Sequence, residues 1–505
     1  MTPTQPRILI VGGGTAGWLT AAVVAAHHKA SDETGVQVAL IESADVPTIG
    51  VGEGTWPTLK NTVQDIGLPE RQLFERCYAG FKQGGKFVNW VHGNGDFYYH
   101  PFTVPLGYGK IDLAPYVDDI ANYAVDANFQ QAVCEAGLAP RTLAEAEFGG
   151  QCNYAYHLDA GAFGDLLKNH CRDNLGVTHI VDTVTGFERH DDGSIKAALA
   201  TNSGAIEADL FVDCTGFASL LLGKELDVPF VDRDDVLFND RALAMQVPYA
   251  NPSDDVACQT IATAQSAGWI WDIGLTHRRG VGHVYSSQYM SDDEAESRLR
   301  SYLGSAANGL DARSIKFKSG HRQRFWDKNC VAVGLSAGFV EPLEATAIML
   351  VELSARYIAE HLPRSAEEMD IVATRFNRQM DYRWQRIIDF LKLHYSLTQR
   401  SEPYWQAHQD ESTIPDSLLE DLTMWRGRGP VRSDFDSAVE LFPAASYQYV
   451  IYGMGFRPEF GRQKYLYRDR GQADRIIDRN KQLTDQMLRS LPRHRQYIER
   501  WLAAS

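Results

Sequence analysis

The sequence predicts an α/β protein with a doubly wound sheet, followed by a mostly helical C-terminal region. Arg7–Val11 has the pattern of a short buried strand, and it leads into the glycine-rich Gly12–Trp18 and a helix-forming run. A second β-branched run follows at Val36–Ser43, so the chain opens with a strand–helix–strand unit. After Thr346 the apolar residues recur at intervals of three and four, which is typical of helices.

Further strands are expected at Ala208–Phe217 and Asn329–Gly338, and each is followed by or ends in a glycine-containing turn. Because these strands resemble the first, we expect one nucleotide-binding domain that is dispersed along the chain. The predicted domains are residues 1–360, with aromatic loop insertions at about 91–150 and 225–325, and a helical region over residues 361–505.

The composition argues against several classes of protein and is compatible with a small-molecule enzyme. The chain has 505 residues, of which 44% are hydrophobic and 23% charged, and its net charge is −16. This charge argues against nucleic-acid binding and against adsorption to an anionic membrane. The seven cysteines contain no C-x-x-C pair, which favours the reducing cytoplasm over a disulfide scaffold or a metal site. No signal peptide or membrane span of about 18 apolar residues is expected.

The first motif is a G-x-G-x-x-G turn that follows a strand and opens a helix. Glycines let backbone amides approach a pyrophosphate, and the helix directs its N-terminal donors at the anion. Glu42, at the end of the next strand, could accept hydrogen bonds from ribose hydroxyls. The motif predicts a dinucleotide site without separating FAD from NAD, and a ligand-free glycine turn is the alternative. Its residues are Gly12, Gly14, Thr15, Ala16 and Gly17.

Two further segments are ambiguous when taken alone. Gly50–Thr55 reads GVGEGT, which suits a strap against a flat ligand or a plain loop. In Val333–Ile348 a helix is expected to begin near Pro342, which would place Glu344 in its first turn. Such a helix end could hold an anion, although composition alone favours a glutamate that simply offsets the helix dipole.

Two lysines flank the glycine pair in Phe81–Trp90, which reads FKQGGKFVNW. Most lysines are solvated charges, and that is the default for Lys82 and Lys86. A lysine among aromatic side chains in a dry pocket would instead shift towards the neutral amine and could act as a nucleophile or donor.

Trp269 and Trp271 lie two residues apart in the segment GWIWDIG. In a strand, residues i and i+2 face the same side, so the two indoles are expected to line one face. Core packing is the default interpretation for such a pair.

Taken together, the segments GGGTAGW, PTIGVGEGT, FKQGGKFVNW, GWIWDI and FVEPLEATAI resemble the flavin-dependent halogenases of the tryptophan halogenase family. The resemblance covers most of the chain, and the double-tryptophan motif is its most specific mark. It implies an FAD-binding domain related to aromatic hydroxylases, with a helical C-terminal region that caps the substrate.

The resemblance also implies a reaction. A separate flavin reductase supplies FADH2, and FADH2 with O2 oxidises chloride or bromide to hypohalous acid, which halogenates tryptophan or another indole. Lys82 would hold the electrophilic halogen, and Glu344 would orient it or assist loss of the ring proton. Trp269 and Trp271 would keep the arene away from the flavin.

The remaining site residues also carry over by resemblance. Thr346 and Ala347 fall on the halide site, and His100 and Phe102 fall on the aromatic sandwich around the substrate. No metal is expected, the other partner is a small aromatic molecule, and homodimer formation stays open. The flavin contacts are Gly12, Gly14, Thr15, Ala16, Gly17, Glu42, Gly50, Val184, Leu335 and Ile348.

The sequence departs from the family pattern near two of these sites. Gly274 stands where the tryptophan motif usually has proline, and Glu344–Ala347 reads Glu-Ala-Thr-Ala where Glu-Ser-Thr-Gly is common. We hypothesise that the second change favours bromide over chloride, because bromide is larger and more easily oxidised. The alternatives are an aromatic hydroxylase of the same fold and a flavin-binding protein without catalysis, neither of which needs Lys82, Glu344 and the tryptophan pair.

Overall fold

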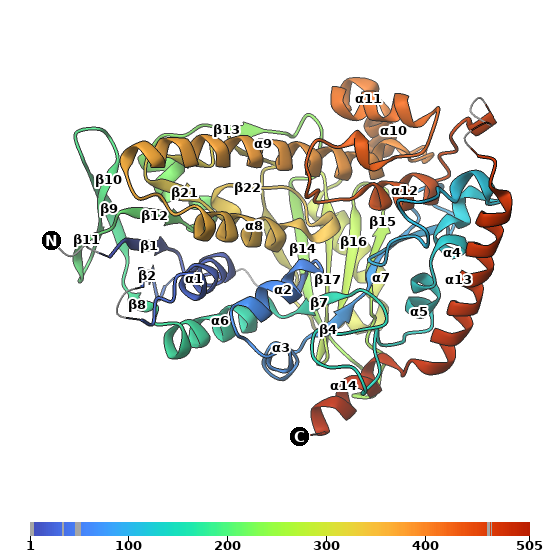
Figure 1. Ribbon diagram of the computed structural model, residues 1–505, viewed down its shortest axis with the longest axis horizontal. Coiled ribbons are helices and arrows are strands. Elements are labelled where there is room, and N and C mark those ends of the chain that lie inside the picture. The colour runs from blue at the N-terminus through green and yellow to red at the C-terminus, as the bar shows by residue number, and fades with distance from the viewer. Residues whose placement is uncertain (1–4, 33–34, 46–51, 462–464, 466, 505) are drawn as a thin grey trace. The chain divides into compact units, whose positions relative to one another are not determined.

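The structure is a computed structural model that describes all residues except 1–4, 33–34, 46–51, 462–464, 466 and 505 (Figure 1). The described chain divides into two compact units, each of which is discontinuous in sequence. Unit 1 comprises residues 1–79, 158–233 and 318–384, and unit 2 comprises residues 80–157, 234–317 and 385–505. The expected α/β fold is confirmed.

Unit 1 is built on a mainly parallel sheet with the strand order β20-β21-β12-β1-β2-β8. Val11 in β1 lies opposite Ile41 on one side and Asp213 on the other, so three expected strands end at the same edge. The expected strands are therefore confirmed, and most of their ends lie one to six residues inside the expected bounds. They are β1 (Arg7–Val11), β2 (Gln37–Glu42), β12 (Leu210–Asp213) and β21 (Cys330–Ala332). Two strands that the sequence analysis did not predict, β8 (Thr178–Val181) and β20 (Trp326–Asp327), form the edges of this sheet.

Helices and smaller sheets complete unit 1. Helix α1 packs against α6 and α8, and its buried side is almost wholly apolar. The helices are α1 (Thr15–His27), α2 (Thr58–Asp65), α3 (Glu70–Arg76), α6 (Ala160–Asn174) and α8 (Thr346–Glu360). The other strands are β3 (Glu53–Gly54), β9 (Val184–Arg189), β10 (Ile195–Ala200), β11 (Gly204–Glu207), β13 (Phe230–Asp232), β19 (Gly320–Arg322) and β22 (Gly338–Phe339).

Unit 2 is built on a sheet with the order β18-β14-β17-β16-β15-β5-β6. Its neighbouring strands pair antiparallel except for β5 and β15, which pair parallel. A separate short strand, β4 (Gly80–Lys82), pairs with β7 (Ala155–Leu158). The strands of the large sheet are β5 (Gly84–Val88), β6 (Phe97–Pro101), β14 (Arg241–Pro248), β15 (Thr260–Ala264), β16 (Trp269–Gly274), β17 (Arg278–Tyr285) and β18 (Arg313–Lys316).

The C-terminal part of the chain is helical, as the sequence predicts. The long helix α9 (Ala366–Ser396) contains the point at which the chain passes from unit 1 to unit 2. Within the described residues, no helix is both long enough and apolar enough to cross a membrane. The helices of unit 2 are α4 (Tyr123–Ala127), α5 (Gln130–Glu135), α7 (Asp292–Leu303), α10 (Pro403–Gln409), α11 (Asp416–Trp425), α12 (Ala444–Gly453), α13 (Arg470–Ser490) and α14 (His494–Ala503).

Candidate active site

The glycine turn between β1 and α1 leaves room for a ligand at one position. Gly12 has a φ of +115°, and a Cβ there would lie 2.2 Å from the carbonyl oxygen of Cys214. A Cβ on Gly13 would lie 1.7 Å from Oε2 of Glu42, so these two glycines are required by close packing. A Cβ on Gly14, in contrast, would meet nothing within 4 Å. Gly14 is the N-cap of α1, so the open space lies at a helix N-terminus, where backbone donors attract a pyrophosphate.

Glu42 ends β2 beside this turn and is held by a histidine. Oε1 of Glu42 lies 2.8 Å from Nε2 of His179, and the His179 ring packs edge-on against Trp18 with ring centroids 5.0 Å apart. The carboxylate is 21% exposed, so it is both oriented and accessible. The glycine turn and Glu42 therefore fit a dinucleotide with its pyrophosphate at α1 and a ribose at Glu42.

The other expected flavin contacts within unit 1 lie in a turn, a strand and a helix. Gly334 has a φ of +75°, and a Cβ there would lie 2.7 Å from Cβ of Ala16, which brings the 3₁₀ turn Gly334–Ser336 against the start of α1. Leu335 is in that turn. Val184 begins β9 and Ile348 is buried in α8. Gly50 lies outside the described residues.

Glu344 lies before α8 and not in its first turn, so that part of the sequence prediction is wrong. Residues Leu343–Ala345 form a short 3₁₀ turn in which Glu344 has a φ of 66° and Ala345 a φ of 54°. These left-handed conformations cannot belong to an α-helix. The turn is closed by the N–H of Ala345, which donates to the carbonyl oxygen of Pro342 at 3.0 Å. Regular helix begins at Thr346.

The two expected halide positions open α8. Thr346 is buried and Ala347 is exposed, and both lie in the first turn, where backbone N–H groups have no partner within the helix. Ala345 is the N-cap residue and offers no side-chain hydrogen bond to these donors. The expected halide residues therefore lie directly after the turn that carries Glu344.

Lys82 ends the short strand β4 and is 4% exposed. Its Nζ lies 5.3 Å from the centroid of the Phe102 ring, which is also buried. The charge of Lys82 adds to burial in lowering the pKa of His157, which pairs across the sheet with Gly80. The structure thus brings the expected lysine and one expected aromatic residue together.

A histidine from the C-terminal helix fixes the backbone next to Lys82. The N–H of Phe81 donates to Nε2 of His494 at 2.9 Å, so this nitrogen is an acceptor and the ring is neutral. Nδ1–H then donates to the carbonyl oxygen of Val256 at 2.9 Å. Burial lowers the pKa of His494 to about 4, in agreement with a neutral ring.

Lys86 has a different environment from Lys82. Its Nζ forms an ion pair with Oε1 of Glu135 at 2.7 Å and lies 4.4 Å from the Phe97 ring centroid. Glu135 is 40% exposed, so this pair lies at the surface. Lys86 is therefore a partly exposed charge that is paired with Glu135, whereas Lys82 is buried with its Nζ near the Phe102 ring.

His100 lies in β6 and contacts aromatic residues that the sequence prediction missed. The centroid of its ring lies 5.7 Å from the ring centroid of Phe390 in α9 and 6.5 Å from that of Tyr449 in α12. The hydroxyl of Tyr449 donates to the carbonyl oxygen of Thr103 at 2.9 Å, which anchors α12 next to β6. The aromatic spacing of Ser446–Phe456 was the available signal for Tyr449, whereas Phe390 is indistinguishable from the other apolar positions of a long helix.

Trp269 and Trp271 lie in β16, as expected, and they are 1% and 4% exposed. Their ring centroids are 6.4 Å apart, and Trp271 lies opposite Gly282 of β17, where a Cβ would come within 2.1 Å of the indole. Glycine at 282 thus provides the space for this ring. Nε1 of each indole is buried and has no hydrogen-bond partner among the described residues. Gly274 ends the strand.

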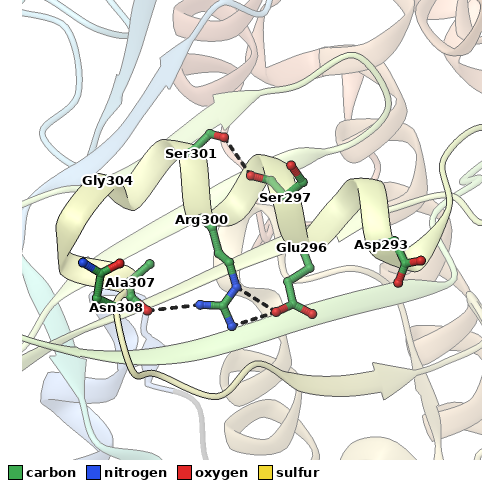
Figure 2. Close-up of a pocket in the computed structure, with 8 residues that line it drawn as sticks. All are labelled: Asp293, Glu296, Ser297, Arg300, Ser301, Gly304, Ala307 and Asn308. Atoms are coloured by element: carbon green, nitrogen blue, oxygen red, sulfur yellow. Dashed lines mark hydrogen bonds and ion pairs between the residues drawn. The ribbon is translucent and has the colours of Figure 1, made fainter.

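A surface depression along α7 is separate from these residues. Figure 2 shows that Arg300 forms an ion pair with Glu296 and donates to the carbonyl oxygen of Ala307, so its guanidinium is occupied within the depression. None of the expected site residues lines it. Over the described part of the chain, no group of three His, Cys, Asp or Glu side chains could hold a metal ion.

Comparisons with known proteins agree on one family. The family model for tryptophan halogenase matches residues 7–467. The chain is 34% identical to 7-chloro-L-tryptophan 6-halogenase KtzR of Kutzneria sp. (strain 744), over 98% of this chain and 99% of the relative. The tryptophan halogenase from Shewanella frigidimarina NCIMB 400 is 43% identical with a TM-score of 0.93, covering 100% of this chain and 99% of that one. Tar14, a tryptophan C-6 flavin-dependent halogenase, is 33% identical with a TM-score of 0.91 and coverage of 99% and 100%.

Proposed function

This chain belongs to the tryptophan halogenase family and is a flavin-dependent halogenase, and on that premise we propose how it acts. It forms hypohalous acid from O2 and chloride or bromide, using FADH2, and it halogenates tryptophan or another indole. The observation that carries this proposal is Lys82, a buried lysine whose Nζ lies 5.3 Å from the ring centroid of Phe102. A lysine in such surroundings is suited to hold an electrophile next to an arene.

The cofactor would be held by the glycine turn of unit 1. The open position at Gly14 and the amides that begin α1 would receive the pyrophosphate, and Glu42 would accept from a ribose. When bound, reduced flavin supplies with O2 the two-electron oxidation of the halide. A separate flavin reductase would deliver the FADH2. The remaining contacts would come from Thr15, Ala16, Gly17, Gly50, Val184, Leu335 and Ile348.

The halide would bind at the start of α8. The amides of Thr346 and Ala347 lie in the first turn, where hydrogen-bond donors and the helix dipole favour an anion. Ala345 and Ala347 stand where serine and glycine are common in the family, so this end lacks a hydroxyl and a glycine. We therefore propose that bromide is used more readily than chloride.

Lys82 would transfer the halogen to the substrate. Its amine would either hydrogen-bond to hypohalous acid or exchange one N–H for N–X with release of water. The arene then takes the halogen, and Glu344 would orient the electrophile or accept the proton that leaves the ring carbon. Burial of Lys82 excludes the water that would otherwise compete for the halogen.

The substrate would be an indole that packs against aromatic side chains of unit 2. His100 and Phe102 are buried, and Phe390 and Tyr449 extend this aromatic group from α9 and α12. These contacts support the proposal that the helical region 361–505 caps the substrate. Relatives are named as tryptophan 6- and 7-halogenases, which favours tryptophan or a simpler indole. Trp269 and Trp271 would form the partition that keeps it from the flavin.

The test is an assay with FAD, a generic flavin reductase, NADH and O2, with equal chloride and bromide, against a panel of indoles and phenols. Products are identified by mass. Halogenated indole, with brominated product in excess, is the expected result. Hydroxylated product would instead identify an aromatic hydroxylase, and the absence of any product would identify a flavin-binding protein. A clear excess of chlorinated product would contradict the proposed halide preference alone.

A further inference from the structure

The turn that carries Glu344 is held by a tryptophan from a distant part of unit 1. Nε1–H of Trp56 donates to the main-chain carbonyl oxygen of Glu344 at 2.6 Å. The indole is 7% exposed, so this hydrogen bond is shielded from water. The bond joins residues that are 288 positions apart in sequence.

The turn itself has a conformation that its residues do not favour. Glu344 and Ala345 are consecutive non-glycine residues with φ values of 66° and 54°. Left-handed backbone is uncommon for such residues, and it persists where surrounding contacts determine it. The hydrogen bond from Trp56 acts directly on the peptide group between these two residues, since it binds the carbonyl oxygen of the first.

The segment that supplies Trp56 also grips α8 at a second point. The hydroxyls of Thr58 and Thr62 donate to the carboxylate of Glu352 at 3.1 Å and 2.6 Å. Glu352 lies one and a half turns beyond the start of α8 and is buried. These two hydrogen bonds join α2 to α8. Because Trp56 lies two residues before α2, they also restrict the position of Trp56 relative to α8.

We propose that Trp56 is a positioning residue for halide use: it holds the left-handed turn at Glu344–Ala345, and so sets both the entry into α8 and the placement of the Glu344 side chain. This inference rests on the proposed function, because the halide is expected at Thr346 and Ala347. The hydrogen bond also fixes the direction of the Glu344 carbonyl group, whose oxygen points at the indole of Trp56. We infer that this keeps the partial negative charge of the oxygen from turning towards a bound halide.

The experiment compares two tryptophans of unit 1 that make the same kind of bond. Trp56→Phe removes the N–H and keeps an aromatic ring. Trp326→Phe is the matched control, because Nε1 of Trp326 donates to the carbonyl oxygen of Lys328 at 3.1 Å and the side chain is also buried, at 1% exposure. The KM for bromide and kcat are measured for both variants and for the unaltered enzyme.

We expect Trp56→Phe to raise the bromide KM about three- to tenfold, the range that follows from loss of one hydrogen bond. Trp326→Phe should leave this KM within about twofold. Adding Ala345→Gly to Trp56→Phe should restore much of the affinity, because glycine adopts positive φ readily. An unchanged KM in Trp56→Phe, an equal rise in Trp326→Phe, or no restoration by Ala345→Gly would each overturn the inference.

A second readout does not depend on catalysis. Amide hydrogen exchange in a peptide covering residues 343–350 should be faster in Trp56→Phe than in the unaltered protein and unchanged in Trp326→Phe. Unchanged exchange in Trp56→Phe overturns the positioning role even if the enzyme is active. If the unaltered protein forms no halogenated product, the proposed function fails, and the exchange result still decides whether Trp56 holds the turn.

Discussion

The two residues proposed for halogen transfer, Lys82 and Glu344, lie in different kinds of backbone structure in the two units. In unit 2, Lys82 ends a short β-strand, and the neighbouring N–H of Phe81 binds a buried histidine. In unit 1, Glu344 lies on a left-handed turn, and its main-chain carbonyl oxygen accepts a hydrogen bond from the side chain of Trp56. Strand pairing supports the first arrangement, whereas a hydrogen bond from a residue far away in sequence supports the second. We therefore expect a single substitution near the Glu344 turn to change halide use more readily than a single substitution near Lys82 changes the position of the lysine.

The largest expected effect is that of Lys82→Ala. Removing the amine that we propose holds the halogen should lower formation of halogenated indole by at least about 100-fold, the scale of a positioned catalytic group. Lys86→Ala is the matched control from the same segment, since Lys86 is paired with Glu135 at the surface, and it should retain activity within about twofold. Product is measured by mass, and FAD binding by flavin absorbance. Equal losses in the two variants would contradict the difference drawn between these lysines.

Glu344→Gln should have the next largest effect. The amide keeps the shape of the side chain but cannot accept the ring proton as a carboxylate does, so kcat should fall by about 30-fold while FAD binding is retained. Steady-state kinetics with saturating bromide measure the change. A variant that retains full kcat would show that this turn serves only to shape the start of α8.

Gly282→Ala tests the packing behind the tryptophan pair. A Cβ at this position would lie 2.1 Å from the Trp271 ring and 2.5 Å from the carbonyl oxygen of Leu243, so the strand or the indole must move. We expect a loss of about 3 kcal/mol in the free energy of unfolding. Gly186→Ala, in β9, is the control because its nearest neighbour would be 3.9 Å away. Urea unfolding followed by tryptophan fluorescence distinguishes them, and similar midpoints would contradict this packing.

The smallest expected effect is the pH dependence that His494 contributes. Its pKa falls from an ordinary value of 6.5 to about 4 in the folded protein. Below pH 6.5 the unfolded chain therefore binds a proton that the folded chain does not, so stability falls as the pH falls from about 6.5 towards about 4. At pH 5 this difference is about 2 kcal/mol. His494→Gln should reduce the change in unfolding free energy between pH 7.5 and pH 5 by about that amount, and an unaltered change would contradict the neutral, buried ring.

The strands of unit 1 could be predicted because their pattern is local. A run such as Arg7–Val11 followed by three glycines carries strand, turn and helix start within a few residues. The tryptophan pair could be predicted for the same reason, since alternation in a strand fixes which side chains share a face. The difference between Lys82, the proposed reacting lysine, and Lys86 could not be predicted from the local sequence, because the two have similar neighbours and differ in burial and in the ion pair with Glu135.

The turn at Glu344 could not be predicted, and the reason is physical. Proline at 342 and alanine at 345 both suit a helix start, and no glycine marks the left-handed backbone. The contact that favours this backbone comes from Trp56, far away in sequence. The proximity of Phe390 and Tyr449 to His100 likewise arises only when α9, α12 and β6 pack together, although the aromatic spacing around Tyr449 was a local signal.

Two products measured in one reaction test most directly whether halogen reaches the arene through Lys82. With FADH2, O2 and bromide, monochlorodimedone reports hypobromous acid that escapes, and mass spectrometry reports brominated indole. In Lys82→Ala we predict that brominated indole is lost while escaping hypobromous acid is maintained or increased. If both fall together while FAD binding is retained, Lys82 acts before hypobromous acid forms, and this route is contradicted.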